Sequence, residues 1–117
     1  MRTAANLVIP FDWRFLEIAP AVLATTVDAE SAVFLGHFPD HPVVPGVCLI
    51  ELADRAARDR GMAASALVRI ASAKFTDAVL PADRLTVQLS RDGSTVTAVV
   101  RTDRGENCRI VLDYEPS

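Results

Sequence analysis

Three prolines at three-residue intervals, Pro39, Pro42 and Pro45, constrain the fold of this chain more than any other feature. Each proline ring fixes φ and removes a backbone N–H, so this segment cannot be helical and stays extended. Both histidines of the chain, His37 and His41, lie in the same stretch. The sequence therefore predicts a stiff loop that presents an imidazole, the side chain best suited to move protons near neutral pH.

An apolar segment follows the loop and predicts a helix over residues 46–60. It opens with Val47-Cys48-Leu49-Ile50, which is followed by a single carboxylate, Glu51, and Gly61 supplies a C-terminal stop. Apolar side chains occupy nearly every face of the first two turns, so we expect this part of the helix to be buried all round. A proton-transfer site is thereby outlined, in which a loop imidazole precedes an acid set among apolar residues.

The rest of the chain alternates short strand-like runs with turns. The expected strands are residues 15–19, 22–27, 67–75, 84–90, 95–102 and 108–113, with one helical turn near residues 31–35. This order predicts a single α+β domain over residues 1–117, an antiparallel sheet wrapped around one central helix. One helix cannot cover a six-stranded sheet completely, so the exposed edge and rim favour pairing with a second subunit.

Composition excludes several classes of function. The net charge is −3 and no basic cluster exists, so we expect no nucleic-acid partner. Cys48 and Cys108 are isolated, which argues against a disulfide framework. Neither a signal peptide nor an apolar run long enough to span a membrane is visible, and we expect a cytoplasmic protein without a membrane partner.

Two motifs resemble the hot-dog-fold 3-hydroxyacyl-[acyl-carrier-protein] dehydratases of the FabZ/FabA group. The first is Gly36-His37-Phe38-Pro39-x-x-Pro42-x-x-Pro45-Gly46-Val47, with Glu51 fourteen positions after His37. The second is Ala73-Lys74-Phe75-x-x-Ala78-Val79-Leu80-Pro81-x-Asp83-x-Leu85. Together they span roughly residues 31–90, and their spacing makes the match specific. The resemblance implies a hot-dog fold and a hydro-lyase that converts a 3-hydroxyacyl thioester to the trans-2-enoyl thioester.

The same resemblance implies roles for five residues. His37 removes the proton from carbon 2, while Glu51 of the partner subunit holds or donates the proton that leaves with the hydroxyl group. The thioester oxygen gains negative charge, and the backbone N–H at Gly46 is expected to stabilise it. Phe38 and Val47 are expected to contact the substrate. This chemistry requires no metal and no organic cofactor.

Simpler interpretations compete for several of these residues. His37 and His41 have the spacing of two metal ligands on a helix, but the prolines exclude the helix. Glu51 could form an ordinary ion pair with Arg55 one turn later. Cys48 lies near Glu51, yet a free cysteine in an apolar helix is more often a packing residue than a nucleophile.

Two other classes of function remain open from the sequence: a hot-dog thioesterase, and a non-catalytic subunit that completes a heterodimeric dehydratase. The resemblance implies that an acyl carrier protein brings the substrate. Thr76 and Asp77 stand where the family commonly has basic residues, which weakens or relocates the surface for an acidic carrier protein. We expect a homodimer or a heterodimer with a second hot-dog subunit, and a specialised pathway such as polyketide or polyene assembly rather than housekeeping fatty-acid synthesis.

Overall fold

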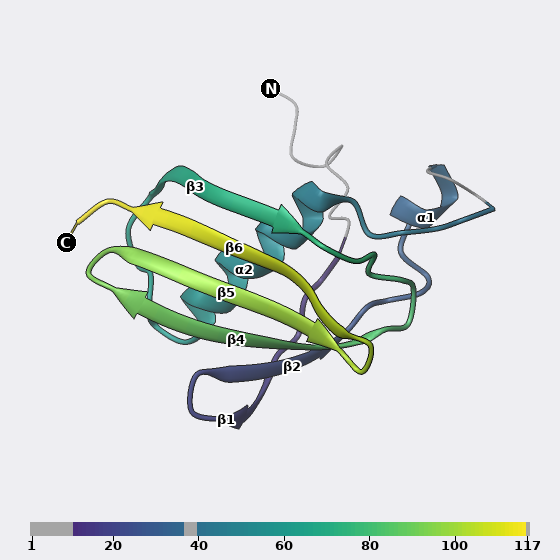
Figure 1. Cartoon of the computed structure of the whole chain (residues 1–117), viewed down its shortest axis with the longest axis horizontal. Helices are drawn as coiled ribbons and strands as arrows, with labels where there is room; N and C mark the ends of the chain where they lie inside the picture. Colours follow the sequence, from purple (N-terminus) through teal and green to yellow (C-terminus); the bar gives the residue numbers. More distant parts are fainter. Residues whose placement is uncertain (1–10, 37–39, 117) are drawn as a thin grey trace.

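A computed structural model describes residues 11–36 and 40–116 of the chain, which form one six-stranded antiparallel sheet and two helices (Figure 1). The elements in chain order are β1 (Leu16–Ala19), β2 (Val22–Thr26), α1 (Val33–Gly36), α2 (Gly46–Asp59), β3 (Leu67–Phe75), β4 (Arg84–Asp92), β5 (Thr95–Thr102) and β6 (Gly105–Tyr114). The spatial order of the strands is β1-β2-β4-β5-β6-β3. Strand β3, which follows the helix directly, therefore forms one edge of the sheet.

The sheet covers α2 because its central strands alternate between apolar and polar side chains. In β4, for example, Leu85, Val87 and Leu89 are buried, whereas Gln88 and Ser90 point to solvent. Helix α2 contributes the other half of the core from one face, which consists of Cys48, Leu49, Leu52, Ala53, Ala56 and Ala57. Small alanines in the second half of the helix let the strands approach it closely.

The uncovered side of α2 corrects one expectation from the sequence. Its first two turns are not buried all round in the single chain, because Val47 is 72% exposed and Ile50 and Glu51 are only half-buried. A single sheet contacts a helix from one side, and the described chain contains no second layer over this stripe. The apolar residues at the start of the helix therefore mark a surface rather than a closed core.

Strand β3 is exposed along almost its whole length and pairs only with β6. Ile70 and Phe75 oppose the buried residues Leu112 and Cys108, so they lie on the helix-facing side of the sheet, yet each remains 46% exposed. Val68 is 58% exposed on the same strand. An edge strand with free backbone groups and uncovered apolar side chains is a surface for pairing with another chain.

The sequence predicted most element bounds to within one or two residues. Residues 67–75 and 95–102 are strands as expected, and Gly61 follows the helix with φ of 72°. The main difference is β6, which begins at Gly105 rather than at residue 108. Its first residues read Gly-Glu-Asn, which are poor strand formers by composition, but Gly105 and Glu106 pair with Thr102 and Arg101 across the hairpin.

An ion pair ties this hairpin to the segment before β4. The guanidinium of Arg104 lies 2.6 Å from one oxygen of Asp83 and 3.0 Å from the other. The Asp83 side chain is 12% exposed, and Oδ2, the oxygen that lies 2.6 Å from Arg104, also accepts a hydrogen bond from the Leu80 N–H at 2.8 Å. The hydrogen bond from Arg104 is the main reason why the pKa of Asp83 lies below its ordinary value.

This lowered pKa predicts an acid-sensitive contribution to stability. Because the pKa of Asp83 is lower in the folded state, its ionised carboxylate stabilises the fold fully at pH values above the unfolded-state pKa of about 3.9. This contribution is lost as the pH falls through the folded-state pKa. We expect Asp83→Asn to lower the free energy of unfolding by about 1–2 kcal/mol at pH 7, a figure reduced for the solvent exposure of Arg104. Urea unfolding at pH 7, 5 and 3 should show the difference from wild type shrinking at the lowest pH.

Asp103→Asn is the matched control, since Asp103 is 93% exposed and lies 3.8 Å from the same guanidinium. It should change stability by less than about 0.5 kcal/mol at every pH. A stability gap for Asp83→Asn that stays constant down to pH 3 would contradict the assignment.

Candidate active site

The loop that carries the predicted base is only partly described. His37, Phe38 and Pro39 lie outside the described residues, so the predictions for His37 and Phe38 remain predictions. Before this gap, α1 is anchored by Phe34, whose ring meets Phe11 edge-on with centroids 5.7 Å apart. Phe11 in turn stacks on Trp13 at 4.8 Å. This aromatic cluster fixes the chain that leads into the loop.

After the gap, the loop is tied to the segment that follows β3. The Val44 N–H donates to the carbonyl of Val79 at 2.8 Å, and both side chains are buried. Pro45 then occupies the N-cap of α2 in an extended conformation, and its carbonyl accepts the N–H groups of Cys48 and Leu49. Pro45 therefore does what the sequence predicts: it keeps the chain extended up to the first residue of the helix.

Two backbone donors remain free at the start of α2. Within the described ranges, no hydrogen bond is found from the N–H groups of Gly46 or Val47. The first N–H groups of a helix have no partner inside the helix and point along its axis, where they attract negative charge. These two donors match the expected role of Gly46 as a backbone donor to a thioester oxygen.

A hollow of about 360 Å³ opens beside these donors. Its lining comes from the proline loop, the first turn of α2 and the end of β3 with the segment after it: Val43, Val44, Gly46, Leu49, Phe75, Thr76, Asp77, Ala78 and Val79. Close packing against Phe75 favours a glycine at position 46. A Cβ at this position would lie 3.1 Å from the ring of Phe75, which already fills the space above the glycine.

Glu51 lies on the uncovered stripe of α2, one helical turn after Val47. Residues four apart share a helix face, so the carboxyl group and the exposed Val47 side chain look out in the same direction. No hydrogen bond or ion pair of the Glu51 side chain is found among residues 11–36 and 40–116. The alternative that Glu51 pairs with Arg55 is wrong in this structure, because Arg55 lies 4.0 Å from Asp12 instead.

The second histidine offers little support for a metal site. His41 is exposed at the surface of the loop. The described part of the chain contains no group of three histidine, cysteine, aspartate or glutamate side chains close enough to share a metal ion. Residues 11–36 and 40–116 also contain no helix that is both long and apolar enough to cross a membrane.

Both cysteines are buried, and burial raises the pKa of each thiol. The pKa of Cys108 rises to about 12, first through burial and then through the charge of Glu106. The pKa of Cys48 is raised first by burial and then by the nearby charge of Glu51. A thiol needs its thiolate form to attack, so neither group is activated as a nucleophile.

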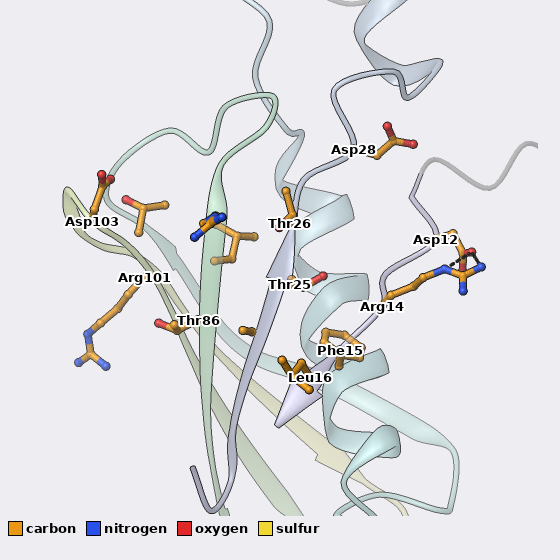
Figure 2. A pocket seen from close by; sticks show the side chains of 14 residues that line it. Asp12, Arg14, Phe15, Leu16, Thr25, Thr26, Asp28, Thr86, Arg101 and Asp103 are labelled. Carbon is orange, nitrogen blue, oxygen red and sulfur yellow. Dashed lines mark hydrogen bonds and ion pairs between the residues drawn. The ribbon is translucent and has the colours of Figure 1, made fainter. Parts of the chain in front are cut away.

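A larger, open pocket lies elsewhere and does not carry the predicted chemistry. It has a volume of about 990 Å³ and lies between the segment before β1, the strands β2 and β4, and the end of β5 (Figure 2). Figure 2 shows Asp12 and Arg14 on one side, Arg101 and Asp103 on the other, and threonines of β2 and β4 between them. The free N–H groups and Glu51 are not among its lining residues. We therefore place the candidate site at the start of α2.

Sequence reasoning did not identify one polar residue near this site. Asn107 is completely buried, and its side chain donates a hydrogen bond to the carbonyl of Ala78, which lines the smaller hollow. Its side-chain oxygen has no hydrogen-bond partner among the described residues. In the sequence Asn107 stands between Glu106 and Cys108, so no pattern marks it in advance as a buried residue.

Comparison with known proteins agrees with this geometry. The family model of the ApeI-like dehydratases, described as ApeI dehydratase, matches residues 17–111. A 3-hydroxyacyl-[acyl-carrier-protein] dehydratase FabZ of Chlamydia pneumoniae is 31% identical over 121 residues, covering 82% of this chain and 78% of that protein. Another FabZ, of Campylobacter lari, is 41% identical over 75 residues, but the match spans only about half of each chain, 55% and 51%.

Solved structures show the same fold. The dehydratase heterocomplex ApeI:P of Xenorhabdus doucetiae superimposes with a TM-score of 0.72 at 20% identity, over 90% of this chain and 96% of that one. A thioesterase superfamily protein, RHA08564, superimposes with a TM-score of 0.60 at 20% identity, over 88% and 55%. The sheet and its helix thus form a hot-dog fold, and the matching family model makes the chain a dehydratase of that fold. More specifically, the chain belongs to the ApeI-like dehydratase family.

The burial of both thiols makes a prediction about their reactivity. With a pKa of about 12, only about one Cys108 thiol in ten thousand is ionised at pH 8. We expect no labelling of the folded protein by iodoacetamide at pH 8, and two labels per chain after unfolding in urea, counted by mass spectrometry. Ala64→Cys, at an exposed loop position, is the positive control for the reagent. Rapid labelling of Cys48 in the folded protein would restore it as a candidate nucleophile.

Proposed function

We propose that the protein dehydrates a 3-hydroxyacyl thioester, bound to an acyl carrier protein, to the trans-2-enoyl thioester. The observation that carries this proposal is the position of Glu51, an unpaired carboxyl group on the uncovered stripe of α2, one turn from two free backbone N–H groups. Charged side chains are rarely left half-buried and unpaired without a function. The matching dehydratase family supplies the class of reaction.

The reaction divides into two proton movements. His37 takes the proton from carbon 2, and the electrons of that C–H bond form the carbon–carbon double bond. The C–O bond at carbon 3 breaks, and Glu51 gives a proton to the departing hydroxyl group, which leaves as water. The proton on His37 then returns to Glu51 through solvent, so that both groups are ready for another turnover.

The start of α2 supports the charged intermediate. Removal of the carbon 2 proton places negative charge on the thioester oxygen, and the N–H groups of Gly46 and Val47 are available to donate hydrogen bonds to it. Preorganised backbone donors of this kind are typically worth about 10²–10³-fold in rate. Phe38 and the exposed side chain of Val47 are proposed to contact the acyl chain.

We further propose that two subunits share each site, so that His37 of one chain acts with Glu51 of the other. Three observations support a side-by-side dimer: the open edge of β3, the exposed apolar residues Val68, Ile70 and Phe75 along it, and the uncovered stripe that carries Glu51. A second sheet joined at β3 would bring a partner loop over that stripe. The structural neighbour named as a heterocomplex, ApeI:P, makes a second hot-dog subunit the alternative partner.

The carrier protein is proposed from the relatives. The FabZ relatives are named for substrates carried on acyl carrier protein, and we propose the same form of substrate here. We also propose a specialised pathway such as polyketide or polyene assembly rather than housekeeping fatty-acid synthesis, and we place the reaction in the cytoplasm.

A thioesterase remains the second candidate function, because a thioesterase superfamily protein shares the fold. Hydrolysis would need an activated water at the thioester carbon and would release a free acid. The proline loop with its histidine, followed by the acid on α2, favours dehydration instead. The two activities are separated by their products.

The product assay is the direct test. Incubation with 3-hydroxyacyl- and saturated acyl-carrier-protein substrates should give an enoyl thioester from the first and no free acid from the second. His37→Ala and Glu51→Gln should each lower turnover by about 10²–10⁴-fold, because each removes a group that transfers a proton. Glu51→Asp, which keeps the proton but loses reach, should be affected less.

Two matched controls accompany these variants. His41→Ala removes the exposed histidine of the same loop, and Glu30→Gln removes an exposed acid outside the site. Both should retain activity near that of the wild type. Equal turnover of Glu51→Gln and wild type would reduce Glu51 to a surface residue, and release of free acid would identify a thioesterase.

A further inference from the structure

A β-bulge places Asn107 where it can reach the site. Across the β5–β6 hairpin, Val100 opposes Cys108 and Arg101 opposes Glu106, so Asn107 is an additional residue with no partner on β5. A bulge of this type changes the direction of the side chain at that position. The Asn107 side chain is thereby buried completely, beneath the segment that follows β3.

Asn107 binds this segment through both its side chain and its backbone. Its amide Nδ2 donates to the Ala78 carbonyl at 3.0 Å. Its own carbonyl accepts the N–H groups of Thr76 at 2.8 Å and Asp77 at 3.2 Å. Three consecutive residues after β3 are therefore held by one residue of β6.

The ion pair of Arg104 and Asp83 holds the other end of the same segment. Arg104 also reaches the Ala78 carbonyl, at 3.4 Å, so this oxygen accepts from two side chains of the hairpin. The Asp83 carboxylate accepts the Leu80 N–H at 2.8 Å. Residues 76–83, although they form neither helix nor strand, are thus fixed at several points.

The fixed segment supports the start of α2. Val79, next to Ala78, accepts the Val44 N–H at 2.8 Å, and Val44 directly precedes the N-cap Pro45. A continuous path of hydrogen bonds and peptide groups therefore runs from Asn107 through Ala78, Val79 and Val44 to the free N–H groups of the helix.

We propose that Asn107 is a positioning residue of the active site: it sets the Ala78–Val79 peptide and, through the Val44 hydrogen bond, the direction of the backbone N–H donors at the start of α2. The assignment rests on the proposed function of those donors at the thioester oxygen. Asn107 itself does not contact the substrate. Displacing catalytic groups by about 1 Å can cost on the order of 10²-fold in rate. Loss of the Asn107 hydrogen bond should therefore lower the rate measurably, although Asn107 lies outside the substrate contacts.

The stability of the fold alone does not account for an asparagine at this position. The buried Oδ1 has no partner among the described residues, and a buried acceptor without a hydrogen bond costs about 1–3 kcal/mol. An apolar side chain at this buried position would avoid that cost. What the apolar residue cannot supply is the donor to Ala78.

The test replaces Asn107 by Leu, which has a similar volume but no donor, and by Asp, which keeps the shape and presents acceptors. For folded, assembled protein at saturating substrate, we expect both variants to lower kcat by about 10- to 100-fold with KM changed less than about threefold. Thr95→Val is the matched control. It removes the Thr95 side-chain hydrogen bond to Asp113, 2.7 Å long, at the far end of the β5–β6 hairpin, and should leave kcat unchanged.

A second readout does not depend on catalysis. Hydrogen exchange of the Val44 amide, measured by NMR, should be at least about tenfold faster in Asn107→Leu than in wild type, and unchanged in Thr95→Val, because the carbonyl that accepts this N–H is no longer fixed. If Asn107→Leu does not fold, kcat and the Val44 exchange rate of Asn107→Asp test the proposal instead. A normal kcat or an unchanged Val44 exchange rate in the folded variants would overturn the proposal. If the wild type shows no dehydration but Val44 exchange still depends on Asn107, the proposed function fails and the positioning effect stands.

Discussion

The packing of one helix against one side of a curved sheet is the constraint on which the rest of this structure depends. Leu49 and Leu52 and the alanines after them are buried between α2 and the central strands. Each fully buried leucine contributes about 1.5–3 kcal/mol through removal of apolar surface from water. Because a sheet contacts a helix from one side, the same arrangement leaves the opposite stripe of α2 uncovered, and that stripe carries Val47 and Glu51.

The proposed dimer would account for two exposed features of the described chain together. Strand β3 lies at the edge of the sheet with apolar side chains facing the helix side, and the uncovered stripe of α2 lies on that same side. A second subunit paired at β3 would extend the sheet and cover the stripe. Burial by a partner would also exclude water from the site, which strengthens the electrostatic interactions inside it.

Much of the fold could be predicted from the sequence because it is encoded locally. The alternation of apolar and polar residues around Val87 favours a strand. The glycine after α2 ends the helix, and the proline before it fixes where the helix begins. The resemblance of the proline loop and the second motif to the FabZ/FabA group also gave the correct family. The position of His37 relative to Glu51 stays a prediction, since His37 lies outside the described residues.

The structure differs from the sequence-based predictions where a residue's environment depends on packing between segments that are distant in the sequence. Val47 reads as a core residue among apolar neighbours, yet it is exposed because no strand passes over it. The closeness of Gly46 to the ring of Phe75, on the edge strand β3, is likewise set by packing between segments that are distant in the sequence. Asn107 acquires its contact with Ala78 only through a bulge in β6, and no local pattern places that bulge.

The central claim is that each site is built from two chains, and complementation between inactive variants measures it most directly. His37→Ala and Glu51→Gln chains are unfolded together, refolded, and assayed after mass spectrometry of the intact assembly confirms mixed dimers. A mixed dimer contains one site with both groups intact and one site with neither, so the mixture should recover a substantial fraction of wild-type turnover while each variant refolded alone stays inactive. Mixed dimers that form and remain inactive, or a wild-type protein that is fully active as a monomer, would contradict the shared site.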